Sequence, residues 1–196
     1  MAQTDNSYLA DKVMLRARHL PPVDPVRVLD CYAGEGVVWR HVRQVTGRDI
    51  RTTGIDVRDL GYLLPGDNRA YLMSMDLNRF DVIDLDAYGV PFEQIQIVAE
   101  RGFQGVLFIT FIQSLYGELP SSLLSALGYS PEMVEKIPTI FYRDGWDKLK
   151  RYLAKLGAKQ VVHRSHDKKH YLMVNGAELS VKGYGSQEAG RVANLF

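Results

Sequence analysis

The chain has little cysteine and no long apolar run. Its one cysteine, Cys31, excludes an internal disulfide framework and is typical of a reducing compartment. No stretch reaches the roughly 20 apolar residues that span a bilayer. The first seven residues are polar and lack the basic-then-apolar order of a secretory signal. We therefore expect a cytoplasmic protein with no membrane partner.

The chain also has little net charge, +1, but its two parts differ in sign. Residues 1–130 carry 12 Lys and Arg against 16 Asp and Glu, whereas residues 131–196 carry 12 against 7. A basic part beside an acidic one suits a polyanionic substrate such as nucleic acid. A solvated helix face and a charged hairpin turn would give the same counts, so charge alone leaves both interpretations open.

No internal repeat, low-complexity tract or Gly/Ser linker divides the 196 residues, which are 46% hydrophobic and 24% charged. This length and composition predict a single soluble domain over residues 1–196. Within it, residues 1–25 form a helix and lead-in, and residues 113–138 form an insertion that could cover a substrate as a lid. Residues 176–196 are rich in glycine and predict a loose tail.

Strands and helices alternate along the chain. The apolar runs predict strands at 26–29, 51–55, 70–75, 80–85 and 105–111 and a closing hairpin of strands at 160–165 and 170–174. Helical spacing and end signals predict helices at 7–19, 37–45, 91–101 and 140–156. This order predicts a doubly wound α/β sheet, mostly parallel, with an antiparallel hairpin at its C-terminal end.

A glycine-rich turn follows the first strand. Val26–Asp30 runs into Cys31-Tyr32-Ala33-Gly34-Glu35-Gly36, and a helix opens directly afterwards. Such a turn brings backbone N–H groups and a helix N-terminus to a ligand. A dinucleotide-binding turn needs a third small residue, but Trp39 stands there, and the Gly-Lys-Ser/Thr end of a phosphate loop is absent. Both nucleotide-phosphate interpretations are therefore weakened.

With Val28-Leu29-Asp30 and Gly34-Glu35-Gly36, the chain resembles the class I S-adenosylmethionine-dependent methyltransferases. The resemblance runs from about residue 26 to residue 174 and implies a Rossmann-like sheet of seven strands with S-adenosylmethionine as cofactor. In that family the acid that ends the second strand holds the ribose, and a polar residue after the third strand meets the adenine. The resemblance implies a cofactor site formed by Asp30, Tyr32, Ala33, Gly34, Gly36, Asp56, Val57, Asp76, Leu77 and Asp86.

Any one of these acids could instead cap a helix, because Asp is a favoured N-cap residue. Three acids in register, Asp30, Asp56 and Asp76, favour the cofactor interpretation. No metal is expected. The histidines at 163, 166 and 170 lack ordered ligand spacing, and a hairpin tip collects such residues for solvation.

The turn after the fourth strand suggests the methyl acceptor. Residues 80–91, Phe-Asp-Val-Ile-Asp-Leu-Asp-Ala-Tyr-Gly-Val-Pro, resemble the Asp-Leu-Asp-Pro-Phe-Gly-Ser-Pro stretch of the tRNA guanine dimethyltransferases. Ala87 departs from that pattern, which has proline there, and we expect no counterpart of the additional C-terminal domain of those enzymes within these 196 residues. The resemblance implies methylation of an exocyclic amine, with Asp86 and Tyr88 as catalytic residues and RNA, tRNA above all, as substrate.

The chemistry gives these residue types a reason. Asp86 would accept hydrogen bonds from the acceptor amine and turn its lone pair toward the methyl group, and it could take up the proton afterwards. Tyr88 would stack on a planar base. Asp84 points to the same side of the strand as Asp86 and could support it. Alternatively, Asp86 only caps the following helix and Tyr88 belongs to the core.

Three further residues have weaker signals. Cys31 lacks the electropositive setting that activates a thiol, so we expect a packed residue rather than a nucleophile. Tyr8 and Lys12, in the first helix, could close over the cofactor or contact a phosphate, but an exposed helix face explains them equally well.

Two other functions stay open. One is a small-molecule or protein methyltransferase with the insertion as its lid. The other is a noncatalytic cofactor-binding partner subunit. The oligomeric state is left open.

Overall fold

The computed structural model describes residues 8–113 and 121–180. Seven strands form one sheet: β1 (Val26–Asp30), β2 (Ile50–Asp56), β3 (Leu64–Pro65), β4 (Val82–Leu85), β5 (Val106–Ile112), β6 (Val161–His166) and β7 (Lys169–Asn175). Their order across the sheet is β3-β2-β1-β4-β5-β7-β6. The first five strands pair in parallel, while β7 runs antiparallel between β5 and β6. The predicted fold class is confirmed.

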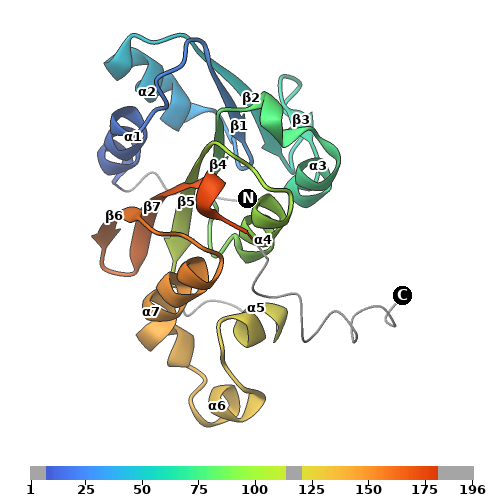
Figure 1. The fold of residues 1–196 in the computed structure, drawn as a ribbon, viewed down its shortest axis with the longest axis vertical. Coiled ribbons are helices and arrows are strands. Elements are labelled where there is room, and N and C mark those ends of the chain that lie inside the picture. Colours follow the sequence, from blue (N-terminus) through green and yellow to red (C-terminus); the bar gives the residue numbers. More distant parts are fainter. Residues whose placement is uncertain (1–7, 114–120, 181–196) are drawn as a thin grey trace.

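Helices cover both faces of this sheet (Figure 1). The described helices are α1 (Leu9–Arg18), α2 (Val37–Thr46), α3 (Asn68–Ser74), α4 (Phe92–Glu100), α5 (Ser121–Ala126), α6 (Pro131–Lys136) and α7 (Ile140–Lys155), with 3-10 turns η1 (Leu77–Arg79) and η2 (Gly176–Glu178). Within the described residues, no helix combines the length and apolar character needed to cross a membrane. The insertion at 113–138 contains α5 and α6, and its residues 114–120 lie outside the described residues.

The core consists of two layers, one on each face of the sheet. Because side chains alternate along a strand, Val28 joins the α1–α2 layer, whereas its neighbour Leu29 joins the layer under α4 and α7. Phe108 and Leu107 divide in the same way on β5. Both faces of the central strands are therefore buried, which explains why β4 and β5 read as near-continuous apolar runs.

The strand predicted at 70–75 is wrong, because α3 occupies Asn68–Ser74. Asp67 caps this helix by accepting a hydrogen bond from the Arg69 N–H at 2.9 Å. The third strand lies earlier and has only two residues, Leu64–Pro65. A short apolar run fits a helix as well as a strand, and here the capping residue decides.

The predicted loose tail begins too early. Residues 176–180 pack against the sheet, with Leu179 buried and the Ser180 N–H donating to the Leu156 carbonyl at 2.7 Å. Gly176 is needed because a Cβ there would lie 2.7 Å from the Gly105 carbonyl oxygen. Residues 181–196 lie outside the described residues, so the prediction for them is not tested.

Candidate functional site

A pocket opens where the strand order reverses, between β1 and β4. In an open parallel sheet, this edge beyond the carboxyl ends of the strands is the usual ligand site. Asp30 ends β1, Asp56 ends β2, and Asp86 follows β4. All three line the pocket, together with Tyr32, Ala33, Gly34, Val57 and Tyr88 from the sequence prediction.

The glycine-rich turn joins β1 to α2 at the floor of this pocket. Gly34 and Gly36 have φ of 51° and 67°, a backbone conformation that other residues rarely adopt. Gly36 is the N-cap of α2 and supplies no side-chain acceptor to the helix's first N–H groups. Gly36 is not among the lining residues, whereas Val37 and Val38 are. The N–H groups of Ala33, Gly34 and Gly36 donate to Ile55, Asp56 and Ala33, so a ligand in the pocket would meet the N-terminal end of α2.

Asp56 lies against this turn. Its Oδ2 accepts a hydrogen bond from the Gly34 N–H at 2.9 Å, which fixes the end of β2 beside the end of β1. Its other neighbour is Arg58, whose Nε lies 2.9 Å from Oδ1. The hydrogen bond from the Arg58 side chain lowers the pKa of Asp56 below its ordinary value. The carboxylate is thus ionised, partly buried and directed into the pocket.

Tyr32 and Val57 line both this pocket and an adjoining hollow. Burial raises the pKa of Tyr32 to about 12, so its phenol stays neutral. Val57 is 79% exposed, which leaves a large apolar surface at the rim. Asn68 lies between the two depressions and donates to the Cys31 carbonyl at 2.8 Å. Together these side chains form a slot suited to a planar, partly apolar group.

Asp76 and Leu77 are not part of this site. Asp76 caps η1 by accepting from the Asn78 N–H at 3.1 Å, and Leu77 is buried in the core. Both had been expected at the end of a third strand that α3 replaces. The residues that do follow the third strand are Gly66, Asp67 and Asn68, each of which lines the pocket or the adjoining hollow.

Asp30 is a buried carboxyl that accepts a hydrogen bond from the Tyr32 N–H at 3.3 Å. Burial, followed by the charges of Asp84 and Asp86, raises the pKa of Asp30 well above its ordinary value. Burial also raises the pKa of the neighbouring Cys31 thiol, in line with the expectation of a packed residue. Neither group is an activated nucleophile.

We predict that Asp30→Asn raises the melting temperature at pH 7. The folded-state pKa of Asp30 lies above its unfolded value, so the ionised carboxyl destabilises the fold at neutral pH, and the amide removes that charge. The gain is about 1–3 kcal/mol, or roughly 3–10 °C. This gain becomes smaller as the pH falls below the pKa of Asp30 in the folded protein, because Asp30 of the folded native chain is then protonated and, like the amide, uncharged.

Scanning calorimetry at pH 7 and pH 5 checks this prediction. Asp81→Asn is the matched control, because the hydrogen bond from Arg27 lowers the pKa of Asp81. That substitution is expected to lower the melting temperature at pH 7. A lower melting temperature for Asp30→Asn as well would contradict the prediction.

Asp86 has two partners in the pocket. Lys12 Nζ donates to Asp86 Oδ2 at 3.0 Å and lies 2.9 Å from Oδ1, and the Thr110 hydroxyl donates to Oδ1. Burial would raise the pKa of Asp86, but the charges of Arg16 and Lys12 with these hydrogen bonds outweigh it and lower the pKa. A carboxylate with a lowered pKa accepts hydrogen bonds well and binds a proton weakly.

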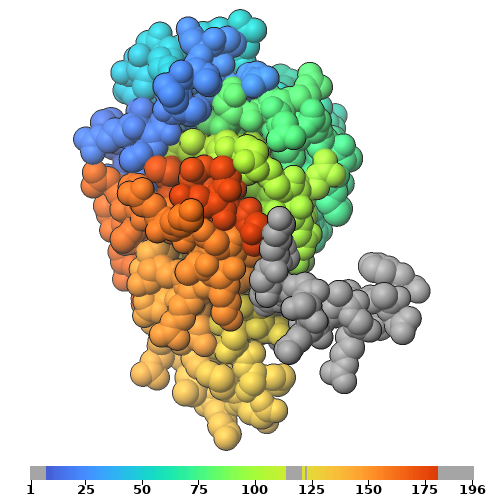
Figure 2. Space-filling model, viewed as in Figure 1, coloured from blue at the N-terminus to red at the C-terminus, as the bar shows by residue number. Residues whose placement is uncertain are grey.

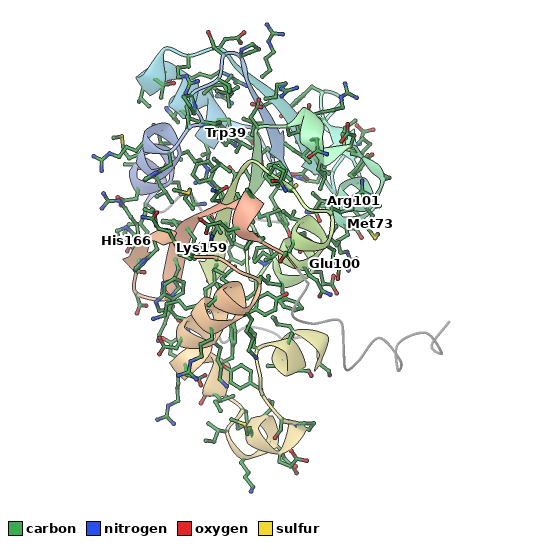
Figure 3. All side chains as sticks on the ribbon, viewed as in Figure 1. Trp39, Met73, Glu100, Arg101, Lys159 and His166 are labelled. Atoms are coloured by element: carbon green, nitrogen blue, oxygen red, sulfur yellow. The ribbon has the colours of Figure 1, made fainter. Side chains whose placement is uncertain are left out.

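Asp84 lies on the same side of β4, as predicted, and it forms a dry ion pair. Arg16 contacts both of its oxygens, from Nε at 2.7 Å and from Nη2 at 2.6 Å, and the Trp39 indole N–H donates at 2.8 Å. The Arg16 and Asp84 side chains are each 1% exposed. Figure 3 places Trp39 between α2 and the sheet. Trp39, which weakens the interpretation as a dinucleotide-binding turn, thus serves as a donor to this carboxylate.

The turn at 86–89 is held by backbone hydrogen bonds. The Ala87 N–H donates to the Leu85 carbonyl at 2.9 Å, and the Gly89 carbonyl accepts from the Ile112 N–H at 2.9 Å. A proline at 87 has no N–H and could not make the first bond. Ala87 is buried and Tyr88 is 78% exposed, so the turn presents its aromatic ring at the mouth of the pocket. Tyr88 is therefore not a core residue.

The histidines of the β6–β7 hairpin have other roles. His170 is buried, lies flat on Trp146 at 4.3 Å between ring centroids, and contacts Ser165 and Gln113. Burial lowers the pKa of His170 to about 4, so the ring is neutral. His166 stacks on Tyr8 at 4.0 Å, and its Nε2 lies 2.8 Å from Asp11. Among the described residues, no three His, Cys, Asp or Glu side chains gather as a metal ion would need.

Sequence reasoning named Lys12 as a residue that could meet the cofactor or a phosphate, but it missed Arg16 and the contacts of α1 with Asp84 and Asp86. Lys12 and Arg16 are both buried, whereas Tyr8 is half exposed, and Lys12 lines the pocket. Figure 2 shows the N-terminal segment, in blue, against the C-terminal hairpin, in orange to red. The only signal in the sequence was the spacing of the two cations, one helical turn apart on the apolar side of a short helix.

Known proteins with the same fold have very different sequences. No family model matches the chain, and no curated protein does. A solved structure from Bordetella parapertussis, named a possible exported protein, is 11% identical with a TM-score of 0.51 and covers 86% of this chain. This chain spans 66% of that protein's length.

Two further solved structures are S-adenosylmethionine-dependent methyltransferases. The one from Archaeoglobus fulgidus is 14% identical and covers 85% of this chain and 93% of its own, with a TM-score of 0.49. The one from Aquifex aeolicus is 14% identical and covers 88% and 98%, with a TM-score of 0.47. At these identities the likeness concerns the fold alone.

Proposed function

We propose that this protein is an S-adenosylmethionine-dependent methyltransferase. The observation that carries the proposal is the contact of Gly34 with Asp56 at the carboxyl ends of β1 and β2, next to the switch point of the sheet, where the Gly34 N–H and the carboxylate meet at 2.9 Å. Two vicinal hydroxyls of a ribose can both donate to one carboxylate, and Asp56 directs such a carboxylate into the pocket. The cofactor's charged methionyl end would lie toward Asp30 and the start of α2.

The adenine of the cofactor fits the slot between Tyr32 and Val57. Asn68 and Asp67, which follow the third strand, take the place at the adenine amino group that had been expected of Asp76. An amide or carboxylate oxygen accepts a hydrogen bond from an amino group, so both residue types have a physical reason. The proposed cofactor thus extends from the glycine turn into the adjoining hollow.

For the acceptor, we propose an exocyclic amine of RNA, with tRNA favoured. The amine nitrogen attacks the methyl carbon in line, the carbon–sulfur bond breaks with its electron pair kept by sulfur, and a proton then leaves the nitrogen. Asp86 orients the amine by accepting its hydrogen bond, and its lowered pKa makes it a poor proton acceptor, so the proton passes to solvent. Tyr88 is exposed at the mouth and can stack on a base.

Isothermal calorimetry tests the cofactor. The protein is expected to bind S-adenosylmethionine and S-adenosylhomocysteine, and Asp56→Ala is expected to weaken both about 10- to 100-fold through two lost charged hydrogen bonds. Asp49→Ala is the matched control, because Asp49 is exposed just before the opposite end of β2. A folded protein that binds neither compound would refute the proposal.

Transfer of a radiolabelled methyl group tests the acceptor. Total RNA, DNA, protein and metabolite fractions are each incubated with the protein and labelled cofactor, and label is expected in RNA, with most of it in tRNA. A polyanionic substrate also predicts a steep loss of transfer as salt rises. Label found only in the metabolite or protein fraction would refute an RNA acceptor and favour a small-molecule or protein methyltransferase. Tight cofactor binding with no transfer into any fraction would favour a noncatalytic partner subunit.

A further inference from the structure

Two cations on α1 are in register with two carboxylates on β4 and its following turn. Lys12 and Arg16 are four residues apart, about 6 Å along a helix, and Asp84 and Asp86 are two residues apart, about 6.6 Å along an extended chain. Arg16 therefore meets Asp84 while Lys12 meets Asp86. Arg16 also donates from Nη1 to the Lys12 carbonyl at 3.1 Å, which joins the two pairs.

The two pairs differ in their surroundings. Arg16 and Asp84 are each 1% exposed, and the Trp39 indole N–H donates a further hydrogen bond to Asp84. This pair is therefore a fixed anchor for the helix. The Lys12 and Asp86 side chains are 9% and 13% exposed, and both residues line the pocket. The anchor places Lys12 at the carboxylate that the proposed acceptor would meet.

Charged and polar groups face Asp86 from every neighbouring element. Lys12 and Arg16 lie on α1, Asp84 on β4, Asp30 on β1, Thr110 on β5, and Lys169 and Tyr171 on β7. The two nearby carboxyls oppose ionisation of Asp86. The two α1 cations and the Thr110 hydroxyl favour it, and Lys12 and Thr110 donate hydrogen bonds to the carboxylate.

We propose that Lys12 is a positioning residue that acts through Asp86. With Thr110, its ammonium fixes the carboxylate so that one edge stays available to the acceptor amine, and its charge keeps Asp86 ionised. The inference rests on the proposed function, because Asp86 is the group that orients the amine. It makes α1 part of the reacting site rather than a cover on the sheet.

Carboxyl carbon NMR of the full chain tests the pair without any acceptor. In Lys12→Met the titration midpoint of Asp86 is expected to rise by about 1–3 pH units, because a contacting opposite charge is removed. Lys12→Arg should keep the midpoint near that of the native chain. Arg18→Met, an exposed cation on the same helix, is the matched control and should not move it. If Lys12→Met does not fold, Lys12→Gln replaces it. An unmoved midpoint in a folded variant overturns the proposal.

The pH profile of methyl transfer into RNA supplies the second test. Loss of Lys12 raises the midpoint of Asp86, so the acid limb of kcat/KM is expected to shift to higher pH by the same amount, while the affinity for S-adenosylmethionine is unchanged. Lys12→Arg should restore the native profile. If the native chain transfers methyl groups and the acid limb of Lys12→Met lies at the native pH, the inference about Lys12 is overturned while the proposed function stands. No transfer by the native chain refutes the proposed acceptor, and the NMR titration still decides the role of Lys12.

Discussion

Replacing Arg16 with methionine is expected to lower the free energy of unfolding by about 3–5 kcal/mol, because it leaves Asp84 buried without its cation. The melting temperature should fall by roughly 10 °C at pH 7. Asp84 is 1% exposed, and the Trp39 indole N–H would still donate to its carboxylate but carries no positive charge. The deficit should shrink as the pH falls, because an unpaired buried carboxyl takes up a proton at higher pH than in the unfolded chain.

A double-mutant cycle separates this charge effect from lost packing. Asp84→Asn keeps an oxygen for the Trp39 indole, so Arg16→Met with Asp84→Asn is expected to recover at least half of the loss. Arg18→Met, on the exposed side of α1, should change the free energy of unfolding by less than about 0.5 kcal/mol. Chemical denaturation measures the native chain, Arg16→Met, Asp84→Asn, the double variant and the Arg18→Met control. A loss for Arg16→Met as small as that of Arg18→Met would mean that the pair does not anchor α1.

The central sheet could be predicted from the sequence because its signals are local. The run into Asp30, the glycine turn and the β-branched strands each show within a dozen residues, and their order along the chain limits the topology to few choices. The same holds for Asp56 and Asp86, since an acid at the end of a parallel strand reaches the ligand edge whichever helix follows.

The third strand could not be predicted in this way. Leu64–Pro65 is too short to show any alternation, and its place in the sheet is set by pairing with Ile55 and Asp56. The apolar run at 70–75, which follows Leu64–Pro65, predicts a strand. That prediction moves the expected adenine contact to Asp76. The capping residue Asp67 was the signal that would have corrected the assignment.

The ion pairs of α1 depend on long-range contacts that no local pattern contains. Arg16 reaches a carboxylate 68 residues away, and Lys12 reaches one 74 residues away. On a short helix, charged residues ordinarily predict a solvated face, and their burial follows only from the position of β4 beneath them. The sequence also does not explain why Ala87 stands where the resembling pattern has proline. In the structure the Ala87 N–H donates to the Leu85 carbonyl, a hydrogen bond that proline could not make.

Asp86→Ala is expected to lower kcat/KM for methyl transfer about 100- to 1000-fold while changing the affinity for S-adenosylmethionine less than about threefold. The alanine removes the hydrogen-bond acceptor that orients the amine, and misorientation of a reacting group costs about 100-fold or more. Calorimetry measures the affinity, and labelled methyl transfer measures the rate.

Two variants distinguish orientation from other roles of this turn. Asp86→Asn keeps one oxygen for the amine and is expected to lose less activity than Asp86→Ala. Tyr88→Ala is expected to raise KM for the acceptor about 10- to 100-fold with a smaller effect on kcat, because stacking on a base contributes about 1–3 kcal/mol. Full activity in Asp86→Ala would remove Asp86 from the mechanism. An equal loss of cofactor affinity and transfer would instead assign Asp86 to cofactor binding.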